Sequence, residues 1–567
     1  MHSLTTGLPT TALPTADEVV SHTLLNCLLR EVSGPEHQSV VSDGHLLLRL
    51  PRRGVLLRVA VRRTSLLGAH RFTGPVHERQ GDGWTEIDWR RLADLTRAEL
   101  SLRTGVRNDE FLTQVASSHE AVESALTGVR DKAVDDPYLA SEQSLLFGHR
   151  FHPTPKARTG DPRDWAAFAP EARAAFPLRY LAVRPSLLAE ESAEAWAVDT
   201  LDGLREVPEG YRLLPVHPWQ YEHLREHPSL LAALDRGDVL DLGTGGREFA
   251  ATASVRTLYD GETFLKFSLN VRITNCLRKN STYELTGAVA LTRLLEPALS
   301  DLAERFPGTG VLREPAYRSL ALPGPDGTPD RDLLEGFGVI VREGLPRRLA
   351  PGTTALLAAA VADEFPTSDA QIARLLPDGS PETALAWWSA YLDLLLPPVL
   401  AAYFDHGLVL EPHLQNVLIC VDPTGMPAQV LFRDLEGTKL LPEHHAAALA
   451  TLPPDVADPM TYDALRGWDR VVYCLFVNHV AELLAALADL HPSLEGELWA
   501  GVRSALTRYA EREGCPPRLA ALLAGVPLPA KANLLTRWER KADREAGYVR
   551  LASPLAESLH LSGSVVR

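Results

Sequence analysis

A run of strict alternation between Leu265 and Thr274 constrains the fold of this chain more than any other feature. Every odd-numbered position carries an apolar side chain and every even-numbered position a polar one, the period-two pattern of a strand with one buried face. Asp260 and Gly261 precede the run and are typical of a hairpin turn. We therefore expect a β-hairpin in which residues 252–257 form the partner strand.

The register of this hairpin decides which side chains face each other. A three-residue loop, 260–262, would pair Arg256 with Lys266 and gather the polar groups on one face, whereas a two-residue turn would pair Arg256 with Leu265. We favour the first, although two opposed cations repel each other unless an anion lies between them. Residues 264–282 contain no acid but four cations, Lys266, Arg272, Arg278 and Lys279, in a chain of formal net charge −16. This concentration favours an anion-binding site over the alternative, a solvated amphipathic strand.

A second group of cations lies in residues 148–160, where two prolines and two glycines argue against a regular helix. Such a loop can aim Lys156 and Arg158 at one anion, as phosphate recognition requires. The alternative is a basic surface loop with structural histidines. His149 and His152 have no third close ligand, so a zinc site is not expected.

A third segment places two apolar runs, Val417–Val421 and Ala428–Phe432, around a Pro-Thr-Gly turn. Folding about this turn brings Asn416 and Asp434 together at the open end of the hairpin. An amide oxygen and a carboxylate suit Mg²⁺, which completes its shell with phosphate and water, and kinases hold their metal with a similar Asn and Asp. His413 is then placed to contact the reacting phosphate or carboxylate. The alternative is an ordinary hairpin with polar ends.

Composition excludes several classes of function. The strongly acidic balance makes the chain a poor non-specific partner for nucleic acid or anionic lipid. The five cysteines show no metal-ligand or redox spacing, and residues 1–15 lack the basic and apolar regions of a signal peptide. The most apolar stretch, 390–404, is too short and too broken by prolines to span a bilayer. We expect a reduced, cytoplasmic protein with no membrane or nucleic-acid partner.

Helical and extended patterns are distributed unevenly along the chain. Residues 16–140 read mainly as helix, with strands expected within 44–61, and residues 141–345 mix strands and loops. Residues 300–332 contain Pro-Gly turns and are expected to form a surface excursion. From residue 346 onward the pattern is mainly helical except for the hairpin described above. Pro218 is expected to begin a helix, with His217 before it interpreted as structural.

These segments together resemble the siderophore synthetases that work independently of non-ribosomal peptide synthetases, the aerobactin-synthetase (IucA/IucC) family. Residues 148–160 are similar to that family's G-H-P-x-H-P-x-x-K-x-R-x-G motif, except that Arg150 stands where a proline is usual. The other motif-like segments follow in order and are Val216–Gln220, Ser254–Thr257, Glu411–Asn416, Arg433–Asp434 and Pro529–Ala532. The resemblance spans roughly residues 140–535.

The resemblance implies roles for individual residues. Those expected to bind ATP are His152, Lys156, Arg158, Ser254, Arg256, Lys266, Arg278, Asn416 and Asp434. Those expected to bind the carboxylate are Arg256, Thr274, Arg278, His413 and Gln415. Glu411, Asn416 and Asp434 are the implied metal ligands, and Arg278, His413 and Lys266 the implied catalytic groups. Residues 274–280 look like the version found in members that take free citrate.

The implied reaction is a ligation that uses ATP and Mg²⁺. A carboxylate, most simply citrate, becomes an acyl-adenylate and is then joined to an amine or hydroxyl, releasing AMP and pyrophosphate. At pH 7 citrate carries about three negative charges and ATP about four, so clustered arginine, lysine and Mg²⁺ are needed to hold both. Two alternatives remain, a small-molecule kinase that would release ADP and a non-catalytic citrate- or siderophore-binding protein.

The family also implies an α+β fold shaped like a cupped hand with three lobes. These are a mainly helical thumb, residues 1–140, a β-containing fingers lobe with the ATP site, residues 141–345, and a mainly helical, kinase-like palm, residues 346–567. Family members are commonly dimers, so a homodimer is expected.

Overall fold

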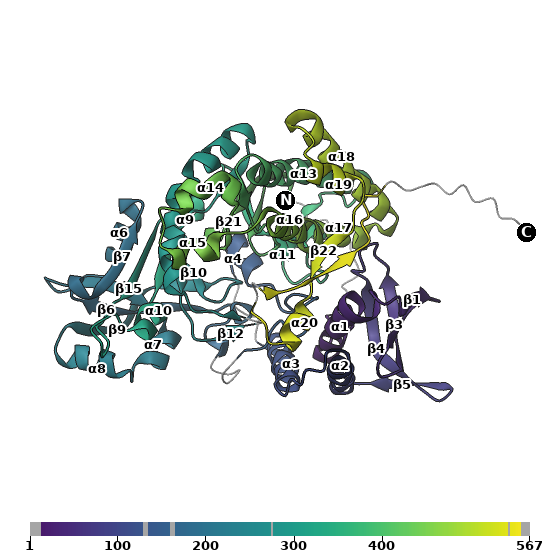
Figure 1. Ribbon diagram of the computed structural model, residues 1–567, viewed down its shortest axis with the longest axis horizontal. Coiled ribbons are helices and arrows are strands. Elements are labelled where there is room, and N and C mark those ends of the chain that lie inside the picture. Colours follow the sequence, from purple (N-terminus) through teal and green to yellow (C-terminus); the bar gives the residue numbers. More distant parts are fainter. Residues whose placement is uncertain (1–12, 129–133, 159–164, 274–275, 543–544, 557–567) are drawn as a thin grey trace, which may run out of the picture.

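The computed structural model describes residues 13–128, 134–158, 165–273, 276–542 and 545–556. Within these residues, helices and sheets alternate along the whole chain, so the expected α+β class is confirmed (Figure 1). The described residues form three sheets of five, eight and four strands, accompanied by short two-stranded ribbons.

The first part of the chain combines helices with a five-stranded antiparallel sheet. Its strands are β1 (Ser39–Ser42), β2 (His45–Leu50), β3 (Val55–Arg63), β4 (Arg71–Gln80) and β5 (Gly83–Ile87). Its helices are α1 (Ala16–Leu28), continued by the π-helix η1 (Leu29–Ser33), then α2 (Trp89–Thr104), α3 (Phe111–Thr127) and α4 (Pro137–Glu142). The expectation of strands only within 44–61 was too narrow, because Gly74 and Pro75 interrupt the alternation of β4.

The core of this first part includes residues from the end of the chain. Leu534 and Trp538 of α20 (Asn533–Trp538) are fully buried among the apolar side chains of α1 and the five-stranded sheet. The carboxylate of Glu31 accepts hydrogen bonds from the backbone N–H groups of Leu534 and Leu535, both at 2.9 Å. Figure 1 shows the yellow α20 beside the purple α1.

The middle of the chain forms an antiparallel sheet in the order β7-β15-β16-β11-β10-β9-β6-β8. Its strands are β6 (Ala175–Val183), β7 (Leu188–Ser192), β8 (Arg212–Val216), β9 (Val239–Ala251), β10 (Thr257–Tyr259), β11 (Thr263–Phe267), β15 (Ala316–Leu320) and β16 (Val339–Glu343). The ribbon β12 (Arg272–Ile273) with β13 (Cys276–Leu277) follows β11. The helices are η2 (Pro170–Ala172), η3 (Pro185–Leu187), α6 (Ala195–Asp202), α7 (Pro218–Leu224), α8 (Pro228–Asp235), α9 (Thr282–Arg305), α10 (Arg331–Gly336) and η4 (Leu345–Arg347).

The expected surface excursion at 300–332 was wrong in its first half. The helix α9 continues to Arg305, and β15 is buried at every position inside the eight-stranded sheet. The turn signals around residues 323–329 do mark an exposed loop. They led to the wrong prediction for the residues before them, because β15 is a strand of only five residues and gives a weak pattern. By contrast, Pro218 begins α7 as predicted, and His217 caps that helix by accepting from the Trp219 N–H, in agreement with its structural interpretation.

The last part of the chain is mainly helical around a four-stranded sheet in the order β14-β20-β19-β17. The strands are β14 (Thr309–Val311), β17 (Thr354–Leu357), β19 (Val417–Val421) and β20 (Pro427–Phe432), with the ribbons β18 (Leu408–Val409) with β21 (Lys439–Leu440) and β22 (Leu528–Lys531) with β23 (Tyr548–Leu551). The helices are α11 (Ala358–Val361), α12 (Ile372–Leu375), α13 (Pro381–Phe404), η5 (Leu435–Gly437), α14 (Pro442–Leu449), α15 (Pro454–Met460), α16 (Ala464–Val472), η6 (Tyr473–Val480), α17 (Ala481–Leu490), η7 (Pro492–Leu494), α18 (Glu495–Glu513), α19 (Pro517–Leu523) and α20.

Two long apolar helices form the core of this last part. The α13 helix and the continuous helix 464–490 are each long and apolar enough, by length and composition, to cross a membrane. Their most apolar windows are 61% and 89% buried inside the protein, which is the environment of core helices.

An ionic cluster joins the five-stranded sheet to the C-terminal helices. We call it the N-terminal cluster, and it consists of Arg63, Arg71, Arg150, Glu364, Glu482 and Asp489. Asp489 accepts from Arg63 at 2.6 Å and from Arg71 at 2.8 Å, and the Arg71 side chain is fully buried. Arg150 contacts Glu364 and Glu482 at 3.1 Å each, so the residue that departs from the family motif is part of this junction.

Candidate active site

The segment predicted as the first strand of the hairpin is a tight turn that precedes β10. Val255 adopts a left-handed backbone conformation with φ +68°, which is strained for a β-branched residue. The Ser254 hydroxyl accepts a hydrogen bond from the Thr257 N–H at 3.0 Å and holds the turn. Thr257 pairs with Lys266, so the predicted pairing of Arg256 with Lys266 is wrong by one residue. The last pair of the hairpin is Tyr259 with Phe264, which leaves four residues, 260–263, between them.

Two cations of this region, Arg256 and Lys266, are neutralised by acids from distant parts of the chain. The Arg256 guanidinium donates to Glu436 at 3.0 Å and to the side-chain oxygen of Asn280 at 2.5 Å. Lys266 is only 2% exposed, although the alternating pattern suggested a polar face, because β11 is buried on both sides. The prediction left the positive charges of Arg256 and Lys266 uncompensated, but tertiary contacts with acids compensate both.

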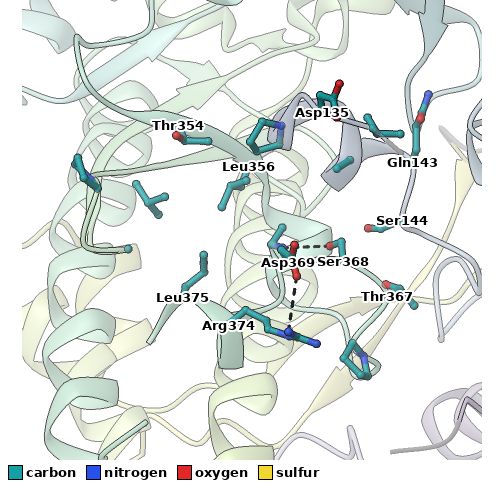
Figure 2. A pocket seen from close by; sticks show the side chains of 18 of the residues that line it. Asp135, Gln143, Ser144, Thr354, Leu356, Thr367, Ser368, Asp369, Arg374 and Leu375 are labelled. Carbon is teal, nitrogen blue, oxygen red and sulfur yellow. Dashed lines mark hydrogen bonds and ion pairs between the residues drawn. The ribbon is translucent and has the colours of Figure 1, made fainter. Parts of the chain in front are cut away.

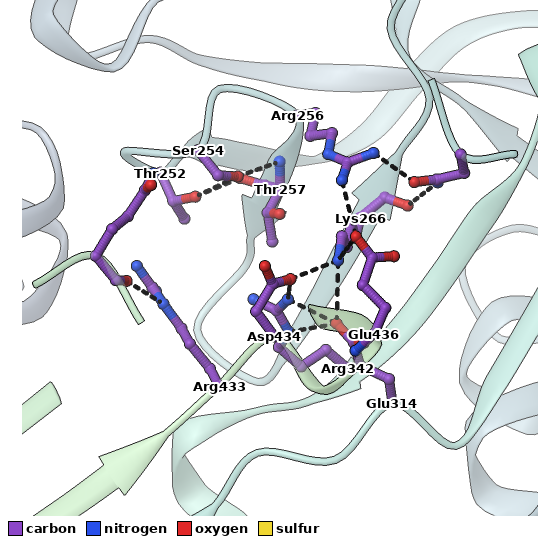
Figure 3. A network of polar contacts seen from close by, with 12 residues as sticks. Thr252, Ser254, Arg256, Thr257, Lys266, Glu314, Arg342, Arg433, Asp434 and Glu436 are labelled. Carbon is purple, nitrogen blue, oxygen red and sulfur yellow. Dashed lines mark hydrogen bonds and ion pairs between the residues drawn. The ribbon is translucent and has the colours of Figure 1, made fainter. Parts of the chain in front are cut away.

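Lys266 lies at the centre of what we call the site cluster, which consists of Arg256, Lys266, Glu314, Arg342, Asp434 and Glu436 (Figure 3). The Lys266 ammonium contacts the Asp434 carboxylate, Glu436 at 2.8 Å and Glu314 at 3.6 Å. Arg342 bridges Glu314 at 2.6 Å and Asp434 at 2.8 Å. Three cations thus face three carboxylates at the junction of the eight-stranded and four-stranded sheets.

The two carboxylates that follow β20 differ in their electrostatics. Burial opposes ionisation of Asp434, but Lys266 and Arg342 hold the pKa of that carboxyl well below its ordinary value. Burial raises the pKa of Glu436, and the Oε2 atom of Glu436 has no hydrogen-bond partner among the residues that the structure describes. Asp434 is the most exposed member of the site cluster at 32%, so it marks the side from which a ligand can approach.

The hairpin that carries Asp434 matches its prediction closely. Strands β19 and β20 pair antiparallel with Val417 opposite Phe432, and the Arg433 N–H donates to the Asn416 carbonyl at 3.0 Å. Asp434 follows in a left-handed conformation with φ +75°. Asn416 and Asp434 therefore come together at the open end of the hairpin, as expected.

The loop before β19 carries three further predicted residues. Glu411 accepts from Arg470 at 2.7 Å, and the attraction of Arg470 outweighs burial and lowers the pKa of the Glu411 carboxyl. Burial lowers the pKa of His413, so its imidazole is neutral at pH 7 even though the charges of Glu411 and Asp434 act in the opposite direction. The Gln415 carbonyl accepts from Arg433 at 2.9 Å.

The remaining predicted residues lie around these elements. The carbonyl of Arg278 accepts from Arg256 at 3.4 Å and the residue is half-buried, whereas Thr274 lies outside the described residues. Lys156 and Arg158 do converge on one anion, which is the internal carboxylate of Glu171, at 3.8 and 2.6 Å. In the same loop, His152 Nδ1 accepts from the Thr154 N–H at 3.2 Å.

Sequence reasoning missed Glu314, Arg342, Glu436 and Asn280. Only Glu436 carried a local signal, since it lies two residues after Asp434 on the same short turn. Glu314 and Arg342 reach the site cluster through strand pairing of β15 and β16, which no local pattern indicates.

A cavity of about 770 Å³ is lined by residues of α4, β17 and the segment 366–377 (Figure 2). Its wall includes Gln143, Glu171, Thr354 and Arg374, and Asp369 contacts Arg374 at its rim. The side chains that line it belong to neither ionic cluster. Among the described residues, no group of three or more His, Cys, Asp or Glu is arranged to hold a metal by itself.

Comparison with known proteins gives two family matches, the IucA / IucC family over residues 137–363 and the ferric iron reductase FhuF-like transporter family over residues 385–546. The L-2,3-diaminopropanoate–citrate ligase of Staphylococcus aureus (strain NCTC 8325 / PS 47) is 32% identical over 71% of this chain and 72% of its own length. The rhizobactin siderophore biosynthesis protein RhbC of Rhizobium meliloti (strain 1021) is 29% identical over 94% of this chain and 97% of its own length. The structure of ATP-bound aerobactin synthetase IucA from Klebsiella pneumoniae superposes with a TM-score of 0.83 at 25% identity, covering 95% of this chain and 99% of that one.

Proposed function

This chain belongs to the IucA/IucC family of siderophore synthetases, and from this premise we propose that it is a ligase that adenylates citrate with ATP and Mg²⁺ and condenses it with an amine or hydroxyl. The relative named as a diaminopropanoate–citrate ligase supports citrate as the acid and an amine as the nucleophile. The structural neighbour with bound ATP supports the nucleotide.

The observation that carries this proposal is the site cluster. Three cations held by three carboxylates form a neutral group, so any anion that displaces a carboxylate finds a positive charge already in place. Lys266 and Arg342 share Asp434, the member most open to solvent. A polyphosphate approaching from that side would take over those contacts with little reorganisation of the cations.

Mg²⁺ fits the oxygen atoms that would meet this polyphosphate. Carboxylate and amide oxygens are suitable hard ligands, and the buried Glu436 Oε2 atom lacks a partner. We propose that Asp434 and Asn416 hold the metal, with Glu436 or Glu411 as a further carboxylate. When bound, Mg²⁺ would supply the charge that lets carboxylate and phosphate approach each other.

The chain's own residues would then position the two substrates. We propose that Lys266, Arg256 and Ser254 hold the phosphates, with His152, Lys156 and Arg158 as further ATP-binding residues. Arg278, His413 and Gln415, together with Thr274, would orient the carboxylate for attack on the α-phosphorus. A neutral His413 can donate to a carboxylate oxygen without adding charge, which leaves the carboxylate nucleophilic. Binding in one pose would also select one of the prochiral arms of citrate.

The family fold supports the three-lobed division into thumb, fingers and palm at residues 1–140, 141–345 and 346–567. A kinase-like palm, a homodimer and a cytoplasmic location, without nucleic-acid or membrane partners, are part of the same proposal. No residue stands out as a base for the second step, so positioning of an already deprotonated nucleophile is proposed to suffice.

The test is the identity of the nucleotide product. Incubation with ATP, Mg²⁺, citrate and a panel of diamines and hydroxy acids should release AMP and pyrophosphate only when citrate is present. Formation of ADP would indicate a kinase, and citrate binding without turnover would indicate a binding protein. Arg278→Ala should abolish adenylation while leaving the circular dichroism spectrum unchanged, and near-normal pyrophosphate release by that variant would contradict the site assignment.

A further inference from the structure

The backbone on both sides of His413 is held by two consecutive residues of the π-helix η6. His479 contacts the carbonyl of Pro412, and Asn478 contacts the N–H of Leu414. A π-helix is rare and often marks a functional site, because its wider turn presents side chains that an α-helix would direct elsewhere. Neither residue belongs to a motif that the sequence analysis singled out.

His479 forms the first contact as a neutral donor. Its Nδ1 atom lies 2.9 Å from the Pro412 carbonyl, and its Nε2 atom lies 2.6 Å from the Tyr391 hydroxyl. Burial lowers the pKa of His479 to about 3, so the ring carries one proton at pH 7. Since the carbonyl can only accept, that proton lies on Nδ1, and Nε2 accepts from Tyr391.

Asn478 forms the second contact and extends it to another loop. Its Oδ1 atom lies 3.3 Å from the Leu414 nitrogen, and its Nδ2 atom lies 2.8 Å from Nε2 of His149. His149 begins the loop that carries Lys156 and Arg158. Asn478 therefore lies between the two loops, hydrogen-bonded to the loop of the candidate carboxylate site and in contact with the loop of the candidate phosphate site.

We propose that Asn478 and His479 are positioning residues that fix the imidazole of His413 relative to the carboxylate it binds. This inference rests on the proposed function, because it gives His413 its role. Clamping the residues before and after His413 leaves its side chain little freedom to rotate away from the substrate, which is how residues outside the reacting groups contribute to rate.

The hydrogen-bond pattern around Asn478 predicts which replacement of this residue retains kcat. His149 Nδ1 accepts from the Phe151 N–H at 3.0 Å, and burial lowers the pKa of His149 to about 3, so its single proton lies on Nε2 and points at Asn478. Leu414 N–H is also a donor, and the Asn478 amide has only one oxygen to offer them. An aspartate has two accepting oxygens and suits both donors, whereas a leucine of similar size suits neither.

The experiment compares Asn478→Leu and Asn478→Asp in two backgrounds, the wild type and His413→Gln, using citrate-dependent pyrophosphate release. Asn478→Leu should lower kcat by about 10- to 100-fold in the wild-type background, the range found for residues that orient active-site groups. In the His413→Gln background, Asn478→Leu should lower kcat by less than about 3-fold, because the imidazole that Asn478 positions is gone. Asn478→Asp should retain kcat within about 5-fold of the wild type.

Gln429→Leu provides a matched control. Gln429 also bridges two backbone groups, accepting from Ala350 N–H and donating to the Arg348 carbonyl, both at 2.8 Å, but it does so away from His413. It should lower the unfolding midpoint and leave kcat unchanged. Equal losses of kcat from Asn478→Leu and Gln429→Leu, or the same loss from Asn478→Leu in both backgrounds, would overturn the proposal. If Asn478→Leu does not fold, Asn478→Ser is measured in the same two backgrounds under the same criteria.

Amide hydrogen exchange separates a failure of this inference from a failure of the proposed function. If the wild type releases no pyrophosphate with any acid, the proposed function fails. The positioning contact is then decided by exchange in the 411–416 peptide, which Asn478→Leu should accelerate and Gln429→Leu should not. Unchanged exchange in Asn478→Leu would overturn the positioning contact as well.

Discussion

The site cluster and the N-terminal cluster contain the same charges but are built differently. Each sets three cations against three carboxylates, yet the N-terminal cluster uses only arginines and takes Arg63, Arg71, Glu482 and Asp489 from regular strands and a helix. The site cluster centres on a lysine and depends on two strained turns, at Val255 and Asp434. Arginine forks hold a fixed geometry, whereas a lysine ammonium exchanges partners readily. The comparison indicates that the N-terminal cluster stabilises the fold, whereas the site cluster can exchange its internal partners for a ligand.

The largest expected effect that tests this contrast is the loss of activity when a residue of the site cluster is replaced. Asp434→Asn removes the carboxylate most open to solvent and should lower pyrophosphate release by about 10³-fold or more, as loss of a group that stabilises transition-state charge does. The unfolding midpoint should change by only a few degrees, because Lys266 keeps Glu436 and Glu314.

Asp422→Asn is the matched control for this variant. Asp422 lies at the closed end of the same hairpin, where it accepts from Thr424. It should retain full activity. Wild-type turnover by Asp434→Asn would remove the distinction between the two clusters.

The next largest effect is on stability in the N-terminal cluster. Arg71→Met leaves Asp489 and Glu364 short of a partner in a buried site and should lower the free energy of unfolding by about 3–5 kcal/mol. Citrate-dependent kcat of the folded variant should stay within about 3-fold of the wild type, because Arg71 is outside the proposed site.

Arg62→Met tests whether burial is the cause. Arg62 also contacts Glu364, at 2.9 Å, but its side chain is 41% exposed. Its loss should cost less than about 1 kcal/mol in urea unfolding. Equal costs for Arg62→Met and Arg71→Met would show that the N-terminal cluster gains nothing from being buried.

A comparable effect, spread over about three pH units, should appear in the pH dependence of stability at Glu31. Burial raises the pKa of Glu31 to about 8, so folding favours the protonated carboxyl and its contribution is lost as pH rises from the unfolded value toward 8. Relative to Glu31→Gln, the wild type should lose up to about 1.4 kcal/mol of unfolding free energy per pH unit between pH 5 and 8. The difference is read from urea titrations at several pH values. A pH-independent difference between the two proteins would contradict the raised pKa.

The smallest expected effect concerns the departure from the family motif. Arg150→Pro restores the usual residue but removes two contacts of a side chain that is 20% exposed, and should cost about 1 kcal/mol of stability. The KM for ATP should not change, since Arg150 faces Glu364 and Glu482. A large rise in the KM for ATP would indicate that Arg150 takes part in ATP binding and does not only stabilise the N-terminal cluster.

The parts of the fold that the sequence predicted are those with local causes. The β19–β20 hairpin follows from two apolar runs around one turn, and Asn416 and Asp434 meet because the turn determines the register. The β10–β11 register was missed because it depends on the left-handed Val255, a conformation that the surrounding contacts impose and the residue itself disfavours.

The same distinction applies to the candidate site. Arg256 and Lys266 were predicted from the hairpin pattern, whereas Glu314 and Arg342 belong to separate segments that only the eight-stranded sheet brings close. Long-range strand pairing leaves no local signal in the chain. The sequence therefore predicted Arg256, Lys266 and Asp434 of the site cluster, and missed Glu314, Arg342 and Glu436.

The packing of α20 into the first core joins residues about 500 positions apart in the sequence. Leu534 and Trp538 complete an apolar core that includes Val20, and the N–H groups of Leu534 and Leu535 cap the Glu31 carboxyl. Contacts between residues so distant in the chain form late in folding, because the entropy cost of closing the loop comes before the gain from the contacts. The first core therefore stays incompletely packed until α20 docks, and a variant that lacks α20 would present cellular quality control with an open core.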